Sequence, residues 1–221
     1  MSHEVRNPLV AIKTFAQLLP DRYDDPEFRD QFSEHVDREV DRLNGIIDQI
    51  NNYAHPPKPT MESVDVGHAL QKGLSMAMKR HPDVHIKLDI SVEDRLPRVW
   101  GDYDALTECF AHVCGNAIEA VLERDKPKIG VKVKRVHNAG GESYVQVQIA
   151  DNGGGITPLI LGKVFSPFCT TKARGMGLGL PIARRTIEDH KGKQSVESGS
   201  EGAVVTVAIP TAKQTADQTV S

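Results

Sequence analysis

The sequence has little cysteine, few aromatic residues and no surplus of positive charge. Lys and Arg total 27 against 30 Asp and Glu, which argues against nucleic acid as a partner. No segment has the length and apolar character of a membrane span, and none has the pattern of a cleavable signal. Three cysteines without the spacing of a metal site indicate reduced thiols and a cytoplasmic location: Cys109, Cys114 and Cys169.

Two common phosphate-binding motifs are also absent. Residues 175–180 read GMGLGL, but no Lys-Ser/Thr pair follows them, so the segment is not a P-loop. No glycine-rich run follows the first expected strand, which excludes a dinucleotide-binding fold. A nucleotide site in this chain therefore requires a third architecture.

The stretch Asp151–Leu180 has the composition of such a site. It begins with DNGGG, continues with an aromatic pair and a Thr-Thr-Lys run, and ends with GMGLGL. Glycine lets the backbone approach a ligand closely, and amides that are free at a helix start bind anions. We interpret the two glycine clusters as walls of a nucleotide pocket with a lid between them. Phe165 and Phe168 are expected to anchor this lid by packing.

Apolar periodicity divides the 221 residues into two regions. A spacing of three and four predicts helices over 1–19, ended by Pro20-Asp21, and over 26–54. The second helix has a narrow apolar seam that one hairpin cannot bury. We therefore expect residues 1–55 to form a helical hairpin that pairs with a second copy into a four-helix bundle. Prolines mark residues 56–62 as a linker.

Residues 63–212 mix the helical period with the period of two typical of strands. Helices are expected within 64–79 and over 102–123 and 180–190, and strands at the start of 64–79 and over 84–90, 98–100, 128–136, 143–150, 194–197 and 203–209. Helices on a mostly antiparallel sheet predict a two-layer α/β sandwich, so the whole chain is α+β. The polar tail 213–221 is expected to be flexible.

The motifs together resemble those of sensor histidine kinases of two-component systems. SHEVRNPL at 2–9 resembles the H box, HVCGNA at 112–117 the N box, and Phe165–Lys172 the F box, while DNGGGI and GMGLGL resemble the glycine boxes. The Thr-Thr-Lys run and the proline-rich linker resemble nitrogen-regulator-type kinases. The resemblance implies a dimerisation and phosphotransfer hairpin, followed by an ATP-binding domain of the Bergerat fold. The position of the H box at the start of the sequence also predicts a piece of a longer protein, in which any sensor or membrane anchor would lie upstream.

The H box implies the chemistry of phosphotransfer. His3 would accept the γ-phosphoryl group of ATP, and Glu4 would act as general base. Asn7, one helical turn further on, would orient water for a phosphatase activity, although a plain surface Asn is an equal alternative. The phosphoryl group would then pass to an aspartate of a response-regulator receiver domain.

The other boxes imply the residues that hold ATP and Mg²⁺. Asn116 would ligate the metal ion, and Asp151 would accept a hydrogen bond from the adenine amino group. The remaining cofactor-binding residues would be Glu119, Gly153, Gly155, Lys172, Gly175, Gly177, Leu178 and Gly179, which include the lid cation and the amides that hold the phosphates.

Two residues depart from the family pattern, and two other functions stay open. His112 stands where the family usually has a first Asn, and Ala203 where it often has Thr near the adenine. One alternative is a GHKL-type ATPase that does conformational work, for which a water-activating carboxylate would be expected at the position of His112. The other is a degenerate dimeric scaffold that binds nucleotide weakly.

Overall fold

The computed structural model describes residues 2–55, 58–170 and 176–212. The chain divides into two compact units, Met1–Pro57 with Ser166–Leu178 and Lys58–Phe165 with Gly179–Ser221. Among the described helices, none combines the length and the apolar character that crossing a membrane requires.

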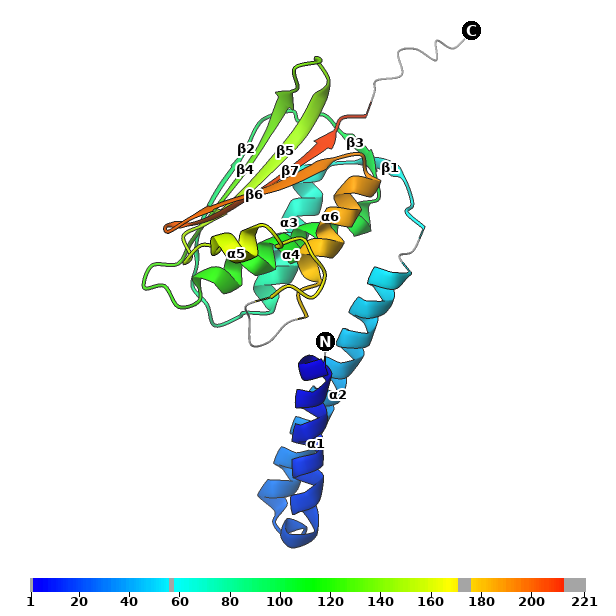
Figure 1. Cartoon of the computed structure of the whole chain (residues 1–221), viewed down its shortest axis with the longest axis vertical. Helices are drawn as coiled ribbons and strands as arrows, with labels where there is room; N and C mark the ends of the chain where they lie inside the picture. The colour runs from blue at the N-terminus through cyan, green and yellow to red at the C-terminus, as the bar shows by residue number, and fades with distance from the viewer. Residues whose placement is uncertain (1, 56–57, 171–175, 213–221) are drawn as a thin grey trace. The chain divides into compact units, whose positions relative to one another are not determined.

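The first unit contains a helical hairpin of α1 (Ser2–Arg22) and α2 (Pro26–Ala54), which lie side by side in Figure 1. The α2 bounds confirm the predicted helix. Its start is capped because Asp25 Oδ1 accepts hydrogen bonds from the amides of Glu27 and Phe28 at 3.1 and 3.3 Å. Near the turn, the Phe15 ring of α1 lies 6.3 Å from that of Phe28 and stacks on His35 at 4.9 Å. These ring contacts hold the turn end of the hairpin together.

The predicted end of the first helix at Pro20 is wrong, because α1 continues through Pro20 to Arg22. Proline has a fixed φ that suits a helix, and in the last turn its missing N–H removes only one hydrogen bond. The chain turns two residues later, where the Asp25 amide donates to the Arg22 carbonyl oxygen at 3.1 Å.

The second unit contains a five-stranded sheet with the order β2-β4-β5-β7-β6. Its neighbours pair antiparallel except β2 and β4, which are parallel, so the expected mostly antiparallel sheet is confirmed. The strands are β2 (Lys87–Val92), β4 (Lys128–His137), β5 (Ser143–Asp151), β6 (Lys193–Gly199) and β7 (Gly202–Pro210). A separate short ladder joins β1 (Glu62–Val64) to β3 (Val99–Gly101).

Three helices cover one face of the five-stranded sheet, as Figure 1 shows. They are α3 (Val66–Lys79), α4 (Tyr103–Val121) and α6 (Gly179–Asp189). A one-turn helix, α5 (Pro158–Leu161), was not predicted, because four residues are too few to show a period. This arrangement is the two-layer α/β sandwich that the sequence predicts.

The core lies between this sheet face and α4. The alternation of buried residues along β5 shows which way the last residue of that strand faces. Val145, Val147 and Ile149 are all at most 1% exposed, so every second residue of β5 faces the helices. Asp151 is the next residue in this series and the last of the strand. Its carboxylate therefore lies on the helix side of the sheet, at the edge of the core.

One cluster of hydrogen bonds fixes where α4 begins. Asp102 caps the helix, since its Oδ1 accepts from the Ala105 amide at 2.8 Å, and its Oδ2 accepts from the Thr60 amide at 2.6 Å. The Asp102 amide donates to Nε2 of His190 at 2.8 Å, while Nδ1 of that ring donates to the Thr186 carbonyl oxygen at 2.6 Å. His190 is only 3% exposed. The neutral ring thus ties the end of α6 to the start of α4.

We expect Gly101→Ala to destabilise the second unit. The added carbon would lie 2.6 Å from Cδ2 of His190, whose two hydrogen bonds resist a shift. Overpacking of this kind costs about 1–3 kcal/mol in the free energy of unfolding. Urea unfolding followed by fluorescence of Trp100 in β3, the single tryptophan, measures the loss. Gly115→Ala is the control because the space around its added carbon is open. Equal midpoints for wild type and Gly101→Ala would contradict this packing.

Candidate functional site

The structure brings the two predicted glycine clusters to the same helix. A side-chain carbon on Gly153 would lie 2.6 Å from the Ala120 carbonyl oxygen of α4, so only glycine fits. A side-chain carbon on Gly179 would lie 3.2 Å from Nδ1 of His112, two turns earlier in α4. Eight residues of helix separate these contacts by about 12 Å. Gly153 and Gly179, one residue from each cluster, therefore meet the two ends of one stretch of α4.

Asp151 has one carboxylate oxygen fixed and one available. Oδ1 accepts hydrogen bonds from the amides of Gly153 at 2.8 Å and Ala203 at 3.3 Å. Within the described part of the chain, Oδ2 has no hydrogen-bond partner. Burial raises the pKa of Asp151, and the two amides and the Arg124 charge oppose that rise. The carboxylate is therefore oriented by the backbone and offers a second acceptor to a ligand.

The loop after Asp151 is held by side chains that the sequence analysis did not single out. Arg124 donates to the Gly153 carbonyl oxygen at 2.6 Å, and Ser198 Oγ accepts from the Ile156 amide at 2.7 Å. Gly155 has a φ of +72°, a conformation that favours glycine. No local signal identifies Arg124 or Ser198, because their partners lie 29 and 42 residues away in the sequence.

The N-box residues share one face of α4. His112, Asn116 and Glu119 are separated by four and three residues, so their side chains project from the same side of the helix. Asn116 is half-buried, and Glu119 is exposed. This face runs between the Gly153 contact and the Gly179 contact. Gly153 and Gly179 thus contact the helix segment that carries Asn116, and Asp151 is hydrogen-bonded to the Gly153 amide.

The residues before α6 carry the second glycine cluster. Gly179 begins α6, whose first amides have no partner within the helix. Gly177 has a φ of +64°, and its carbonyl oxygen accepts from the Phe168 amide at 3.2 Å. Leu178 is buried. Lys172 and Gly175 lie outside the described residues.

The two aromatic residues of the F box differ in their packing. Phe165 is partly buried, and the Arg184 guanidinium lies over its ring at 5.1 Å from the centroid. Phe168 is 45% exposed, so the expectation that it anchors the lid by packing is wrong. Its φ of +64° turns the chain at this position, and the sequence alone could not predict that conformation.

The H-box residues lie in the other unit. His3 and Glu4 are in the first turn of α1, and their side chains lie outside what the structure describes. Asn7 is exposed on the same helix, four residues after His3. Their predicted roles in phosphotransfer and phosphatase chemistry stay predictions.

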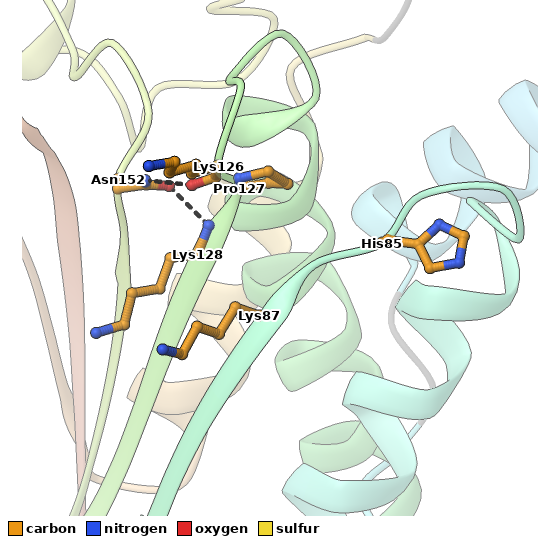
Figure 2. Close-up of a pocket in the computed structure, with 6 residues that line it drawn as sticks. All are labelled: His85, Lys87, Lys126, Pro127, Lys128 and Asn152. Atoms are coloured by element: carbon orange, nitrogen blue, oxygen red, sulfur yellow. Dashed lines mark hydrogen bonds between the residues drawn. The ribbon is translucent and has the colours of Figure 1, made fainter.

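A cavity of about 500 Å³ lies beside the β2 and β4 strands, and Asp151 is not among the residues that line it. Figure 2 shows Asn152 bracing its wall, where Nδ2 donates to the Lys126 carbonyl oxygen and Oδ1 accepts from the Lys128 amide, both at 2.8 Å. The second residue of DNGGG therefore has a structural task, because it fixes the loop before β4 to the end of β5.

The described residues of the second unit form no preformed cage of acidic, His or Cys side chains for a metal ion. Among the described residues, no group of three or more His, Cys, Asp or Glu side chains could hold one. A hard cation at Asn116 would need further oxygen ligands from a bound phosphate or from water. Cys109 and Cys114 are buried free thiols, and burial raises the pKa of Cys114 to about 12, so both are neutral and poor metal ligands.

Two protein families match the chain. Residues 101–213 match the family described as histidine kinase-, DNA gyrase B-, and HSP90-like ATPase. Residues 1–57 match the His Kinase A phospho-acceptor domain. Together these matches confirm the resemblance that the boxes indicate.

Several characterised proteins resemble this chain over most of its length. The sensor histidine kinase ZraS of Salmonella typhimurium is 30% identical over 211 residues, which are 95% of this chain and 44% of ZraS. The sensory histidine kinase/phosphatase NtrB of Vibrio alginolyticus is 26% identical over 215 residues, 95% of this chain and 60% of NtrB. The chain thus spans about half the length of these relatives.

A solved structure of histidine kinase ThkA in complex with the response regulator protein TrrA is also similar. It has a TM-score of 0.76 and 26% identity, and it covers 96% of this chain and 60% of that one. This likeness, together with the two family matches, confirms the expected fold class of a helical hairpin followed by an α/β sandwich.

Proposed function

Because the chain belongs to the histidine kinase-, DNA gyrase B-, and HSP90-like ATPase family, we propose that it is the core of an ATP-dependent protein-histidine kinase. In this proposal, the second unit binds ATP with Mg²⁺, and His3 receives the γ-phosphoryl group. The observation that carries the proposal is the meeting of Gly153 and Gly179 with one stretch of α4, beside the open oxygen of Asp151.

The Asp151 carboxylate is the proposed adenine contact. Its Oδ2 can accept a hydrogen bond from an exocyclic amino group, while Oδ1 is held by two backbone amides. A side-chain carbon on Gly153 would crowd this carboxylate, 2.8 Å from Oδ1, and one on Gly155 would clash with the Gly199 carbonyl oxygen. A guanine base presents a carbonyl oxygen where adenine presents the amino group, so a carboxylate here favours adenine.

Asn116 and the α6 start are the proposed contacts at the other end of the nucleotide. An amide oxygen is a suitable ligand for Mg²⁺, which usually takes few protein ligands and keeps phosphate oxygens and waters. When bound, Mg²⁺ supplies positive charge that offsets the charge of the phosphates. The free amides of Gly179 and its neighbours are suited to hold phosphate oxygens, with Gly175, Gly177, Leu178 and the Lys172 amine as further proposed contacts.

His3 is the proposed phosphoacceptor, within the segment that matches the phospho-acceptor domain. A neutral imidazole nitrogen attacks the γ-phosphorus, the bond to the bridging oxygen breaks, and ADP leaves. Glu4 takes the ring proton as general base. Asn7 is proposed to orient a water molecule for a phosphatase reaction, which removes a phosphoryl group from a partner protein.

A response-regulator receiver domain is the proposed recipient of the phosphoryl group. The similar kinase ThkA was solved with a response regulator, and the relative NtrB is named as a kinase and phosphatase. Phosphohistidine can pass its phosphoryl group to an aspartate of such a domain. The cytoplasm is the proposed location, which agrees with three cysteines that are free thiols.

The hairpin is proposed to pair with a second copy. Five apolar side chains of α1 and α2 are between 42% and 54% exposed in the single chain: Leu9, Val10, Leu18, Val40 and Ile47. Exposed apolar residues that recur along two helices favour association with further helices. A dimer would bury them in a four-helix bundle.

Phosphorylation tests the central proposal. With Mg²⁺ and ATP radiolabelled on its γ-phosphate, the wild-type chain should gain label that is lost in acid and stable in alkali. His3→Gln should remove nearly all of it, because no other side chain is proposed to attack. His55→Gln is the control, since this histidine is an exposed residue just after the end of α2 and lies outside the H box.

Each other outcome of this experiment points to a different function. Equal labelling of wild type and His3→Gln would show that the phosphoacceptor assignment is wrong. Hydrolysis of ATP without label on the chain would indicate an ATPase that does conformational work. Absence of Mg²⁺-dependent nucleotide binding would favour the scaffold.

Asp151→Asn should weaken ATP binding while preserving the fold. The amide oxygen can still accept from Gly153 and Ala203, but an NH₂ donor then faces the adenine amino group. Loss of a hydrogen bond to a charged acceptor should raise the Kd roughly tenfold to a hundredfold. Isothermal calorimetry measures the change, with Asp89→Asn on the exposed edge of β2 as control. An unchanged Kd would remove Asp151 from the proposed site.

Ile47→Asp should convert a dimer into a monomer. This side chain is 52% exposed in the single chain, so the charge costs the hairpin little but would be buried in the bundle. Light scattering should give twice the 24.3 kDa chain mass for wild type and the chain mass for the variant. Leu159→Asp, 78% exposed on α5, should remain a dimer. A monomeric wild type would contradict pairing.

A further inference from the structure

The cavity beside β2 and β4 has a strongly one-sided charge. The residues that line it are His85, Lys87, Lys126, Pro127, Lys128 and Asn152. Over the whole chain, acidic side chains outnumber basic ones by 30 to 27, yet among the described residues no acidic side chain lines this cavity. Three lysines around one cavity therefore form a local excess of positive charge in a chain that has none overall.

Two of these lysines are direct neighbours in the sheet. Lys87 is the first residue of β2 and Lys128 is the first residue of β4, and the parallel register places them opposite each other. Figure 2 shows their side chains running in the same direction from the two strands. Like charges on neighbouring strands repel each other. The fold thus keeps two positive charges together at some cost in stability, which a bound anion would offset.

Little negative charge is available nearby to neutralise the amines. Lys128 Nζ lies 3.6 Å from Asp89 Oδ2, but these side chains are 49% and 66% exposed, and exposed ion pairs contribute little. Within the part of the chain that the structure describes, the amines of Lys87 and Lys126 have no ion pair and no hydrogen bond. Each lysine amine has three N–H donors, so most of the donors at this cavity are available to a ligand.

Hydrogen bonds between different elements fix the backbone around the cavity. The Lys87 amide donates to the Pro127 carbonyl oxygen at 2.9 Å. The Asn152 side chain binds the Lys126 carbonyl oxygen and the Lys128 amide, both at 2.8 Å. All three lysines thus extend from backbone positions that are held in place, and a site built on such positions loses less entropy when it binds.

We propose that this cavity binds a small molecule that carries two or more phosphate or carboxylate groups. Its volume of about 500 Å³ is that of a small-molecule site. The lysine amines hold the anionic groups, and the lysine stems and the Pro127 ring contact the rest of the molecule. Neither Asp151 nor Asn116 lines this cavity, so the site is separate from the candidate nucleotide pocket and does not rest on the proposed function.

Two simple probes, pyrophosphate and citrate, test this inference. In Mg²⁺-free buffer of fixed ionic strength, calorimetry should show saturable binding of at least one probe to the wild-type chain. The double variant Lys87→Gln/Lys128→Gln should raise its Kd roughly tenfold or more, because two hydrogen bonds between charged groups are lost. Lys126→Gln, a change in the loop before β4, should cause part of this loss.

The matched control removes the same charge from the same sheet face. Lys132 and Lys134 follow Lys128 at every second position of β4, and neither lines the cavity. Lys132→Gln/Lys134→Gln should change the Kd by less than about twofold, because salt screens charges that do not touch the probe. Equal losses in the two double variants would show general attraction to a basic strand and would overturn the proposed site.

Backbone amide signals in NMR spectra show where the probe binds. The probe should shift the signals of Lys87, Lys128 and Asn152 with the Kd that calorimetry gives. Shifts at Gly179 without shifts at these three residues would place the probe in the nucleotide pocket and overturn the inference. Absence of binding by both probes would overturn it as well.

The remaining outcomes identify the ligand class and separate this site from the proposed function. Tighter binding of pyrophosphate would indicate a phosphorylated ligand, and tighter binding of citrate would indicate a polycarboxylate. Both double variants should bind Mg²⁺ and a non-hydrolysable ATP analogue as the wild type does, which also shows that they are folded. Failure of the anion site thus leaves the kinase proposal intact, and failure of His3 labelling leaves the anion site intact.

Discussion

Close approach of two glycine backbones to α4 is the constraint on which the candidate site depends. A side-chain carbon on Gly153 would clash with the α4 backbone, 2.6 Å from the Ala120 carbonyl oxygen, and one on Gly179 would crowd the His112 ring at 3.2 Å. These contacts set the two ends of a pocket and leave Asn116 between them. A larger residue at Gly153 would push this wall away from the helix, and one at Gly179 would require the His112 ring to shift.

These two contacts define the site only if α4 itself is held in place. Asp102 holds the start of this helix. Its two carboxylate oxygens hold the Ala105 and Thr60 amides, and its own amide binds His190. Because each group in this cluster has a partner, the helix start cannot rotate without losing several hydrogen bonds. The carboxylate of Asp151 is fixed by the same kind of backbone contact at the opposite edge of the core. Rigid elements rather than loops thus orient the polar groups of the site.

The polar groups along α4 are also distinguished by charge. Asp151 offers an acceptor at one end, and its burial raises its pKa. At the other end His112 is held neutral, beside helix amides that favour anions. ATP presents its groups in the same order. Its adenine amino group needs a hydrogen-bond acceptor, and its phosphates need neutral or positive donors. The chemistry of the site therefore agrees with the two family matches, although it is derived from contacts within one unit.

The sequence by itself determined the helix and strand pattern and the bounds of α2, and it predicted the glycine, Asn and Asp residues of the candidate pocket. Periodicity and short motifs are local signals, and the chain expresses them locally. Only the tertiary structure decided the contacts of Arg124, Ser198 and Ala203, the parallel pairing of β2 with β4, and the exposure of Phe168. The structure also showed that α1 runs through Pro20 to Arg22. These features depend on partners brought together by folding or on turn geometry, and no local pattern encodes them.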